Sequence, residues 1–354
     1  MVKYELGAMV EPLCSWFEEN ERSMPWREEP TPYHVWISEI MLQQTRIEAA
    51  KSYYERFTKR LPDVESLATV SEEELLKLWE GLGYYNRARN LQKAAKLLVD
   101  KYEGQLPAEY DLLLELPGIG SYTAGAIASI AYKKCAPAVD GNVLRVTMRY
   151  LNCQDDISKQ SVRREMERSI MEVIPTEKPG TFNQALMELG EVICIPNGTP
   201  LCDRCPIADT CAGKKCGTQL QLPVKPAKKE RRIEKRTILL IENKGQIALR
   251  QRPKQGLLAG LWEFPSLDGY YTKAKMQEYL GERGISDVKI EKMKDGKHIF
   301  SHVEWHMRGY YVQMEEKTQD MVPNLVWVPR EKLEKNYAIP VAFHSFLHQL
   351  LSQK

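Results

Sequence analysis

Hydrophobic residues in the first 215 positions recur at the spacing of an α-helix. One predicted helical face is formed by Trp36, Ile37, Ile40, Met41 and Ile47. Ser71 and Glu74 have capping-box spacing, which predicts the start of a helix that ends at Gly81. Residues 86–99 and 161–174 follow the same helical spacing. No convincing strand alternation occurs in this region, so we predict that it is entirely α-helical.

The pattern changes after residue 236, where short apolar runs replace the helical spacing. Residues 237–242 and 246–250 flank the tripeptide Asn243–Gly245, which predicts a β-hairpin. The other predicted elements are strands at 299–314 and 324–329 and helices at 273–281 and 341–351. The C-terminal part is therefore predicted to be an α+β domain.

A polar, basic segment separates the two patterns. This segment runs from Leu222 to Arg236, and its basic residues are Lys225, Lys228, Lys229, Arg231, Arg232, Lys235 and Arg236. This composition suits a solvated interdomain linker, and contact with phosphates is the alternative. We predict a first domain at 1–217, a linker at 218–235 and a second domain at 236–354.

Length and composition limit the class of protein. The chain has 354 residues and a mass of 40.8 kDa, which predicts two domains or three. Hydrophobic residues make up 43% and charged residues 28%, values that exclude global disorder and fibrous architectures. No apolar run is long enough to span a membrane, and the first residues lack a signal-peptide pattern. We therefore expect a soluble, cytoplasmic protein with no membrane partner.

The net charge of +2 hides an asymmetry between the two parts of the chain. Residues 1–217 carry 26 basic and 32 acidic side chains, whereas residues 218–354 carry 24 and 16. The first part is thus net acidic, and its charge alone gives no support for nucleic-acid binding. Any such function has to come from local chemistry.

Eight cysteines are present, and disulfides are improbable in an intracellular chain of this size. Cys14, Cys135 and Cys153 are scattered and are predicted to be buried apolar residues. Four of the other five have the spacing C-x7-C-x2-C-x5-C: Cys194, Cys202, Cys205 and Cys211. Only one short C-x2-C knuckle is present, which favours an iron–sulfur cluster over a four-cysteine zinc site. Unmetallated thiols are the third alternative, and Cys216 offers a fifth thiol.

Residues 116–124 combine a Pro/Gly turn with the start of a helix of small residues. Gly118 and Gly120 permit positive φ angles and leave backbone N–H groups exposed at a helix N-terminus. Such a turn binds one phosphate without a cationic side chain. Many helical hairpins, however, use Pro-Gly only for turning.

Two carboxylates have local surroundings that suggest chemistry. Asp140 follows an apolar stretch and begins a helical pattern, a place where aspartate most often caps the helix. Glu39 lies one turn from Trp36 among apolar residues, and burial there raises the pKa of a carboxyl. From the residues alone, a capping aspartate and a solvated glutamate remain the favoured interpretations.

Five segments together resemble the adenine-specific mismatch DNA glycosylases of the MutY type. They are Ser38–Thr45, Trp79–Tyr85, Leu116–Ala124, Val139–Val143 and the cysteine loop, and Phe300–His302 extends the resemblance into the C-terminal part. The resemblance implies a two-lobed helix-hairpin-helix glycosylase domain with a 4Fe-4S cluster loop at 194–211, followed by a Nudix-like α+β domain. The first cysteine gap has seven residues where the family usually has six.

The resemblance also implies a reaction. Members of this family remove adenine paired with 8-oxoguanine in double-stranded DNA, or with guanine, so we expect such DNA as the partner of a monomeric enzyme. Glu39 resembles the acid that protonates adenine N7, and Asp140 the carboxylate that stabilises the oxocarbenium ion or captures it covalently. Tyr122 and Asn142 resemble the residues that assist around that ion and position the water.

Further residues match the family's DNA-binding positions, and base flipping explains why they are needed. Trp26 and Arg27 resemble residues that line the pocket of the flipped adenine. The other expected DNA contacts are Leu42, Gln44, Thr45, Leu82, Tyr84, Gly118, Gly120, Phe300, Ser301 and His302. Among them, Gln44 and Tyr84 resemble wedges in the vacated stack.

Tyr122 occupies the position where related enzymes that also nick DNA carry a lysine. A tyrosine forms no imine with the sugar, so we predict a monofunctional glycosylase. The alternative is an oxidised-pyrimidine glycosylase with lyase activity.

The C-terminal part resembles a Nudix fold at Leu257–Pro265, but its metal-binding signature is degraded at Gln277–Gly284. The signature lacks its arginine and its central glutamate, which argues against Mg²⁺-assisted pyrophosphate hydrolysis. We expect instead that Phe300, Ser301 and His302 recognise 8-oxoguanine. A strand end with a satisfied serine and a nucleotide pyrophosphatase are the alternatives.

Overall fold

A computed structural model describes residues 3–226, 230–283, 285, 288–315 and 325–352. Contacts divide the chain into two compact units. We call Met1–Val70 with Arg89–Ala227 the helical unit, and Ser71–Ala88 with Lys228–Lys354 the sheet unit. A segment from the N-terminal half of the sequence thus packs with the C-terminal half. The predicted limits of the first domain stay a prediction.

The helical unit has no strand among its described residues, as the apolar spacing predicts. Its main helices are α1 (Val10–Asn20), α2 (Pro25–Glu28), α3 (Pro32–Leu42), α4 (Ile47–Arg60), α5 (Val64–Thr69), α8 (Tyr110–Leu114), α9 (Ser121–Ala126), α10 (Gly141–Tyr150), α11 (Gln160–Val173), α12 (Pro179–Val192) and α13 (Ala212–Cys216). Helix α7 (Asn86–Tyr102) runs from the sheet unit into the helical unit. One prediction was wrong: Ile47 begins a new helix, because the chain turns after Leu42 and Gln44 has a φ of +60°.

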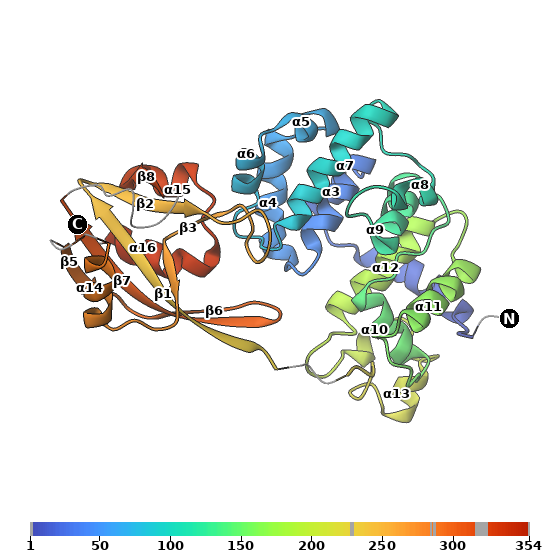
Figure 1. The fold of residues 1–354 in the computed structure, drawn as a ribbon. Helices are drawn as coiled ribbons and strands as arrows, with labels where there is room; N and C mark the ends of the chain where they lie inside the picture. Colours follow the sequence, from blue (N-terminus) through green and yellow to red (C-terminus); the bar gives the residue numbers. More distant parts are fainter. Residues whose placement is uncertain (1–2, 227–229, 284, 286–287, 316–324, 353–354) are drawn as a thin grey trace. The chain divides into compact units, whose positions relative to one another are not determined.

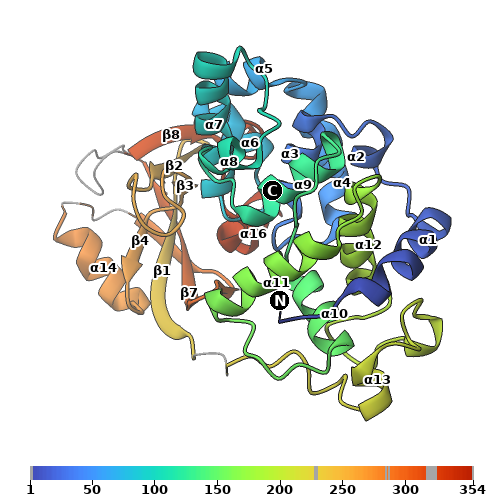
Figure 2. The ribbon, with the colours of Figure 1, turned by 90° about the vertical axis from the view of Figure 1, so that its right-hand side faces the viewer.

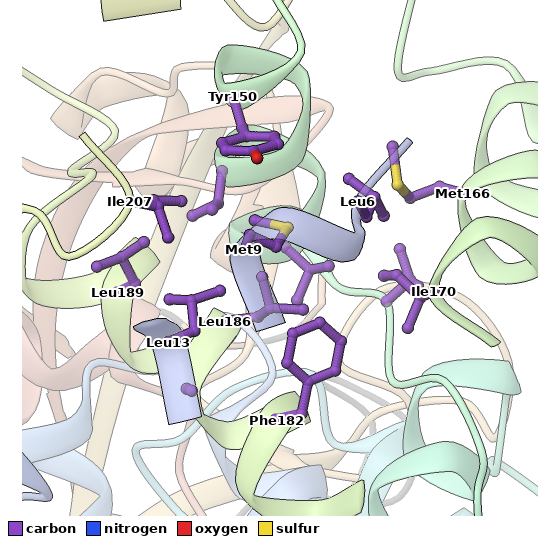
Figure 3. Packing of buried hydrophobic residues seen from close by; sticks show 14 of the residues in the cluster. Leu6, Met9, Leu13, Tyr150, Met166, Ile170, Phe182, Leu186, Leu189 and Ile207 are labelled. Carbon is purple, nitrogen blue, oxygen red and sulfur yellow. The ribbon is translucent and has the colours of Figure 1, made fainter. Parts of the chain in front are cut away.

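Helices α1, α10, α11 and α12 enclose a hydrophobic core (Figures 2 and 3). Leu13 and Phe182 are fully buried there, and α1 packs along α12. Ile207 belongs to the cysteine loop and packs into the same cluster, so the core anchors that loop. Removing the Phe182 ring would cost about 3–5 kcal/mol of folding free energy, because its buried apolar surface would be replaced by a cavity.

The sheet unit is built on a mixed sheet with the strand order β3-β2-β1-β7-β5. Its strands are β1 (Arg232–Asn243), β2 (Gln246–Gln251), β3 (Trp262–Glu263), β4 (Ser266–Asp268), β5 (Val288–Lys292), β6 (Gly296–Ile299), β7 (Val303–Met314) and β8 (Leu325–Pro329). The long strands β1 and β7 pair in parallel, and β1 and β2 form the predicted hairpin.

Both faces of the sheet are covered, as its alternating side chains require. Leu239 and Ile241 of β1 pack towards α14 (Lys273–Gly281), whereas Ile238 and Leu240 pack towards α16 (His344–Ser352) (Figure 1). The sheet unit also includes α6 (Glu72–Leu78) and α15 (Leu333–Asn336). None of the described helices is long and apolar enough to cross a membrane.

Several predicted limits change in the sheet unit. The predicted strand 299–314 is a hairpin of β6 and β7, and the predicted helix 341–351 begins with a short 3-10 turn. Strand β1 starts at Arg232, so the last four residues of the predicted linker belong to the sheet. These residues pair in parallel with β7, so they are part of the sheet and not of a free linker. Predicted linker residues Lys228 and Lys229, Gly284 of the degraded signature and position 324 lie outside the described residues.

The helix predicted to run from Ser71 to Gly81 is shorter than expected. Ser71 caps α6 by accepting a hydrogen bond from the Glu74 N–H at 3.2 Å, as its spacing predicts. The helix ends at Leu78, and Gly81 lies in the following loop with a φ of +99°. A positive φ leaves the helical region, which is why glycine is favoured there.

Candidate active site

A cavity of about 800 Å³ in the helical unit brings together the four predicted catalytic residues and five of the predicted DNA contacts. Its walls include parts of α2, α3, α9, α12 and the start of α10. The predicted residues that line it are Trp26, Arg27, Glu39, Leu42, Gln44, Thr45, Tyr122, Asp140 and Asn142. A cavity of this size falls in the range of small-molecule sites.

Helix α3 places Glu39 in this cavity on a buried turn. Thr31 caps the helix by accepting a hydrogen bond from the His34 N–H at 3.2 Å, and residues 35–41 are all buried. Glu39 itself is 7% exposed. Burial raises the pKa of Glu39 to about 7, although the Tyr122 hydroxyl donates a hydrogen bond to its Oε2. A large fraction of Glu39 is thus protonated at neutral pH, which is the state of a general acid.

Asp140 caps α10 and also faces the cavity. Its Oδ1 accepts a hydrogen bond from the Val143 N–H at 2.8 Å, and its Oδ2 accepts one from Asn142 Nδ2 at 3.0 Å. Burial raises the pKa of Asp140 above its ordinary value, while these hydrogen bonds and the Arg145 charge oppose the rise. Asp140 can therefore cap the helix and present its carboxylate to the cavity at the same time.

Arg145 fixes the orientation of the Asn142 amide. Its Nη2 donates to Asn142 Oδ1 and to the Gly190 carbonyl, both at 2.7 Å, and its Nε donates to the Cys194 carbonyl at 2.8 Å. Because Oδ1 is taken by Arg145, the amide N–H groups face Asp140. A Cβ at position 190 would lie 2.7 Å from the Asn142 Cβ, so glycine allows this close packing.

Trp26 and Arg27 form another part of the wall. Trp26 is buried and meets the Tyr54 ring edge-on, with centroids 5.5 Å apart. Arg27 donates through Nη2 to Glu188 Oε2 at 3.0 Å and through Nη1 to the Arg22 carbonyl at 3.0 Å. Glu188 is 3% exposed and also accepts from Arg22 Nε. One buried carboxylate thus holds two guanidinium groups beside the cavity.

The Pro/Gly turn joins α8 to α9 as its sequence predicts. Gly118 has a φ of +83°, and a Cβ there would lie 2.7 Å from the Asn90 Cβ. Gly120 is the exposed N-cap of α9, and the first N–H groups of a helix have no partner within it. The geometry is suited to a phosphate, and the phosphate contact stays a prediction.

One small cavity of about 30 Å³ is lined by the four cysteines of the predicted cluster loop, Cys194, Cys202, Cys205 and Cys211. Arg149 Nη1 lies 3.4 Å from Cys194 Sγ, and the Lys214 N–H lies 3.5 Å from Cys211 Sγ. Hydrogen bonds to sulfur are typical of iron–sulfur sites, so the converging thiols fit such a cluster by donor type. Among the described residues, Cys216 is exposed and does not line this cavity, and no three His, Cys, Asp or Glu already form a metal-ligand set.

The remaining predicted residues lie in the sheet unit. Phe300–His302 form the tip of the β6–β7 hairpin, where Ser301 and His302 are exposed. The Tyr84 hydroxyl lies 2.7 Å from Ser301 Oγ, although 217 positions separate them in the sequence. Leu82 is 8% exposed, whereas the Tyr84 side chain is half-exposed. Residues from two distant motifs thus meet at one hairpin tip.

Comparison with known proteins identifies two families along this chain. The family described as "HhH-GPD superfamily base excision DNA repair protein" matches residues 37–172, and the NUDIX domain matches residues 237–349. The adenine DNA glycosylase of Homo sapiens is 33% identical over 390 residues, which cover 93% of this chain and 71% of the human protein. This chain belongs to the adenine DNA glycosylase family.

Further matches support this membership of the adenine DNA glycosylases. The adenine DNA glycosylase of Buchnera aphidicola subsp. Schizaphis graminum is 34% identical and covers 83% of this chain and 84% of its own. A trapped endonuclease III–DNA covalent intermediate is 28% identical with a TM-score of 0.51, and covers 59% of this chain and 94% of its own. The protein is therefore a DNA glycosylase of base-excision repair, a hydrolase with a helix-hairpin-helix domain and a Nudix-like domain.

Sequence reasoning missed three charged residues of this glycosylase: Arg22, Arg145 and Glu188. A usable signal was present for Glu188, which lies three positions after Ala185 and one before Leu189 on the buried side of α12. A charged residue at apolar spacing is buried only when it is paired. Arg145, by contrast, donates to two backbone carbonyls, those of Gly190 and Cys194, which no sequence pattern marks.

Proposed function

We propose that this glycosylase removes adenine paired with 8-oxoguanine, or with guanine, from double-stranded DNA. The observation that carries the proposal is the pair Glu39 and Asp140 in one cavity, with a pKa of about 7 at Glu39 and hydrogen bonds that stabilise an anionic Asp140. An acid and an anion side by side are what cleavage of a glycosidic bond to a poor leaving group requires.

In this mechanism Glu39 gives its proton to N7 of the flipped adenine. The electron pair of the C–N bond leaves with the base, and positive charge develops on the sugar. Asp140 stabilises that charge electrostatically, or captures it covalently, and Asn142 and Tyr122 assist around the ion and position the attacking water. Trp26 and Arg27 line the pocket for the base.

We propose a monofunctional enzyme, because Tyr122 occupies the position of the lyase lysine and forms no imine. The cavity wall does include one lysine, Lys133, whose Nζ donates to the Ile130 carbonyl at 2.7 Å. Borohydride trapping of wild type beside Lys133→Met tests this point. A trapped complex that disappears in Lys133→Met would establish a lyase step.

The hairpin tip at Phe300–His302 is proposed to contact the 8-oxoguanine. Its exposed Ser301 hydroxyl and His302 ring offer hydrogen-bonding groups, and Leu82 and Tyr84 are proposed to fill the stack. Because the degraded signature lacks its arginine and central glutamate, recognition is proposed for this domain and not Mg²⁺-assisted pyrophosphate hydrolysis.

The cysteine loop is proposed to hold a 4Fe-4S cluster through Cys194, Cys202, Cys205 and Cys211. Such a cluster would cross-link these four thiols, the first of which, Cys194, follows the end of α12. Aerobically purified protein should be brown and absorb broadly near about 400 nm, with about four irons per chain. A colourless preparation that contains zinc would contradict the cluster.

We also propose that the protein is a monomer, which light scattering would test.

The central test is a single-turnover assay on a duplex with one adenine opposite 8-oxoguanine. Duplexes with adenine opposite guanine and thymine are the controls, and half of each quenched sample is heated in alkali. We expect strand cleavage only after alkali, fastest opposite 8-oxoguanine. Cleavage without alkali would mean a lyase, and no cleavage of either mismatch would refute the proposed substrate.

A further inference from the structure

We propose that Lys77 and Glu80 are positioning residues for discrimination between 8-oxoguanine and guanine, because they dock the loop that carries Leu82 and Tyr84 onto the Nudix-like domain. This inference rests on the function proposed above for the hairpin tip. It assigns to an ion pair at the end of α6 a role that differs from both catalysis and base contact.

The loop after α6 is held from within by its own neighbours. The indole N–H of Trp79 donates to the Gly83 carbonyl at 3.1 Å, and Arg87 Nη2 donates to the Leu82 carbonyl at 3.1 Å. Tyr84 has a φ of +46°, a left-handed conformation that is unfavourable for a residue with a side chain. A loop in such a conformation persists only where its surroundings fix it.

The ion pair supplies a first attachment to the Nudix-like domain. Lys77 Nζ pairs with Glu80 Oε2 and donates to the Tyr337 carbonyl at 3.0 Å. The other oxygen, Glu80 Oε1, accepts from the Ile339 N–H at 2.8 Å. Both side chains are about one-fifth exposed, so solvent weakens these contacts less than on an open surface.

The partner segment of the ion pair, residues 337–339, is itself fixed in the domain. Ile339 is fully buried, and its carbonyl lies 2.9 Å from His344 Nε2. The Ala338 carbonyl accepts from the Trp262 N–H at 3.2 Å. The hydrogen bonds that hold this segment in the domain therefore also hold Glu80, through its bond to the Ile339 N–H.

The loop is therefore hydrogen-bonded to the Nudix-like domain at both of its ends. Glu80 binds Ile339 at its start, and Tyr84 meets Ser301 at the hairpin tip four residues later. With one attachment lost, Tyr84 can rotate about its hydrogen bond to Ser301, and the wedge no longer has one fixed position against the opposite base. The chemistry at Glu39 and Asp140 does not depend on this attachment.

The test compares single-turnover rates on duplexes with adenine opposite 8-oxoguanine and opposite guanine, in the full-length protein. Glu80→Leu removes the acceptor for the Ile339 N–H, and we expect it to lower the rate ratio of the two duplexes about tenfold while the adenine:guanine rate stays within about twofold. Glu80→Gln keeps an acceptor oxygen and should retain most of the ratio. Glu73→Leu on the exposed side of the same helix is the matched control.

Lys77→Met should reduce the ratio in the same way and add little to Glu80→Leu, because both act through one contact. An unchanged ratio in Glu80→Leu would overturn the proposal, and so would an equal fall of both rates with a lower melting temperature. A wild-type protein that does not prefer 8-oxoguanine would refute the proposed function of the tip instead, so the two failures are distinguishable.

Discussion

The cavity in the helical unit and the hairpin tip in the sheet unit place polar groups in opposite surroundings. Glu39 and Asp140 are buried, and burial raises the pKa of both. Ser301 and His302 are exposed at a turn. Acid catalysis at neutral pH needs a carboxyl whose pKa is shifted by desolvation, whereas recognition of a base needs groups that remain free to meet it. The comparison predicts that substitutions in the cavity change the rate of adenine excision. Substitutions at the hairpin tip should instead change the preference for 8-oxoguanine over guanine.

The strongest test of this division is Glu39→Gln, which removes the acid and keeps the size of the side chain. We expect a loss of at least about 10³-fold in the single-turnover rate, towards the upper end of general-acid contributions. Binding to the mismatched duplex, measured by fluorescence anisotropy, should persist. Glu55→Gln, at an exposed position of α4, is the control with the same substitution. Near-wild-type excision by Glu39→Gln would refute the assignment.

Asp140→Asn separates the structural and chemical roles of one residue. Asparagine caps a helix about as well as aspartate, so the melting temperature should change little. The rate should fall about 10²–10³-fold, because the developing positive charge on the sugar loses its anion. If stability and rate fall together in proportion, the helix cap alone explains Asp140.

The pH profile tests the state of the acid. In the proposed mechanism Glu39 acts while protonated, so the rate should fall as the pH rises through about 7. The hydrogen bond from Tyr122 lowers the pKa of Glu39, so Tyr122→Phe should move this limb to higher pH. Asp140 acts while ionised, and its raised pKa should give a second limb above the ordinary range of aspartate. A rate that is constant through neutral pH would contradict the general-acid role.

The smallest expected effect is at the tip. Ser301→Ala removes one exposed hydroxyl and its contact with Tyr84, which is worth about 1 kcal/mol, or about fivefold, in the preference for 8-oxoguanine over guanine. The adenine:guanine rate should be unaffected. If instead both rates fall equally, the hydroxyl has no part in discrimination.

Much of the helical unit was predictable because its signals are local. The helices at 86–99 and 161–174 follow from apolar spacing, and the Asp140 cap follows from an aspartate at the start of a helical pattern. The turn between α3 and α4 was missed because the apolar residues continue at helical spacing across it. The spacing of apolar residues along the sequence cannot reveal a turn of the backbone that leaves this spacing unchanged.

The catalytic roles proposed for Glu39 and Asp140 rest on the resemblance to a family. Taken alone, Glu39 reads as an ordinary helix residue, since its pKa depends on the burial of α3 on all sides. Glu188 was missed for a related reason: its two arginine partners lie more than 160 positions away in the sequence. Burial and pairing are properties of packed elements, not of a local pattern.

The sequence by itself determined the two kinds of domain, the helix caps, the cysteine spacing and the identity of the groups available for chemistry. Only the tertiary structure decided which of these groups meet: Tyr122 with Glu39, Arg145 with Asn142 and the cysteine loop, and Tyr84 with Ser301. The physical reason is that helix period and capping act over three or four residues. Desolvation and hydrogen bonding, in contrast, depend on residues that packing brings together from anywhere in the chain.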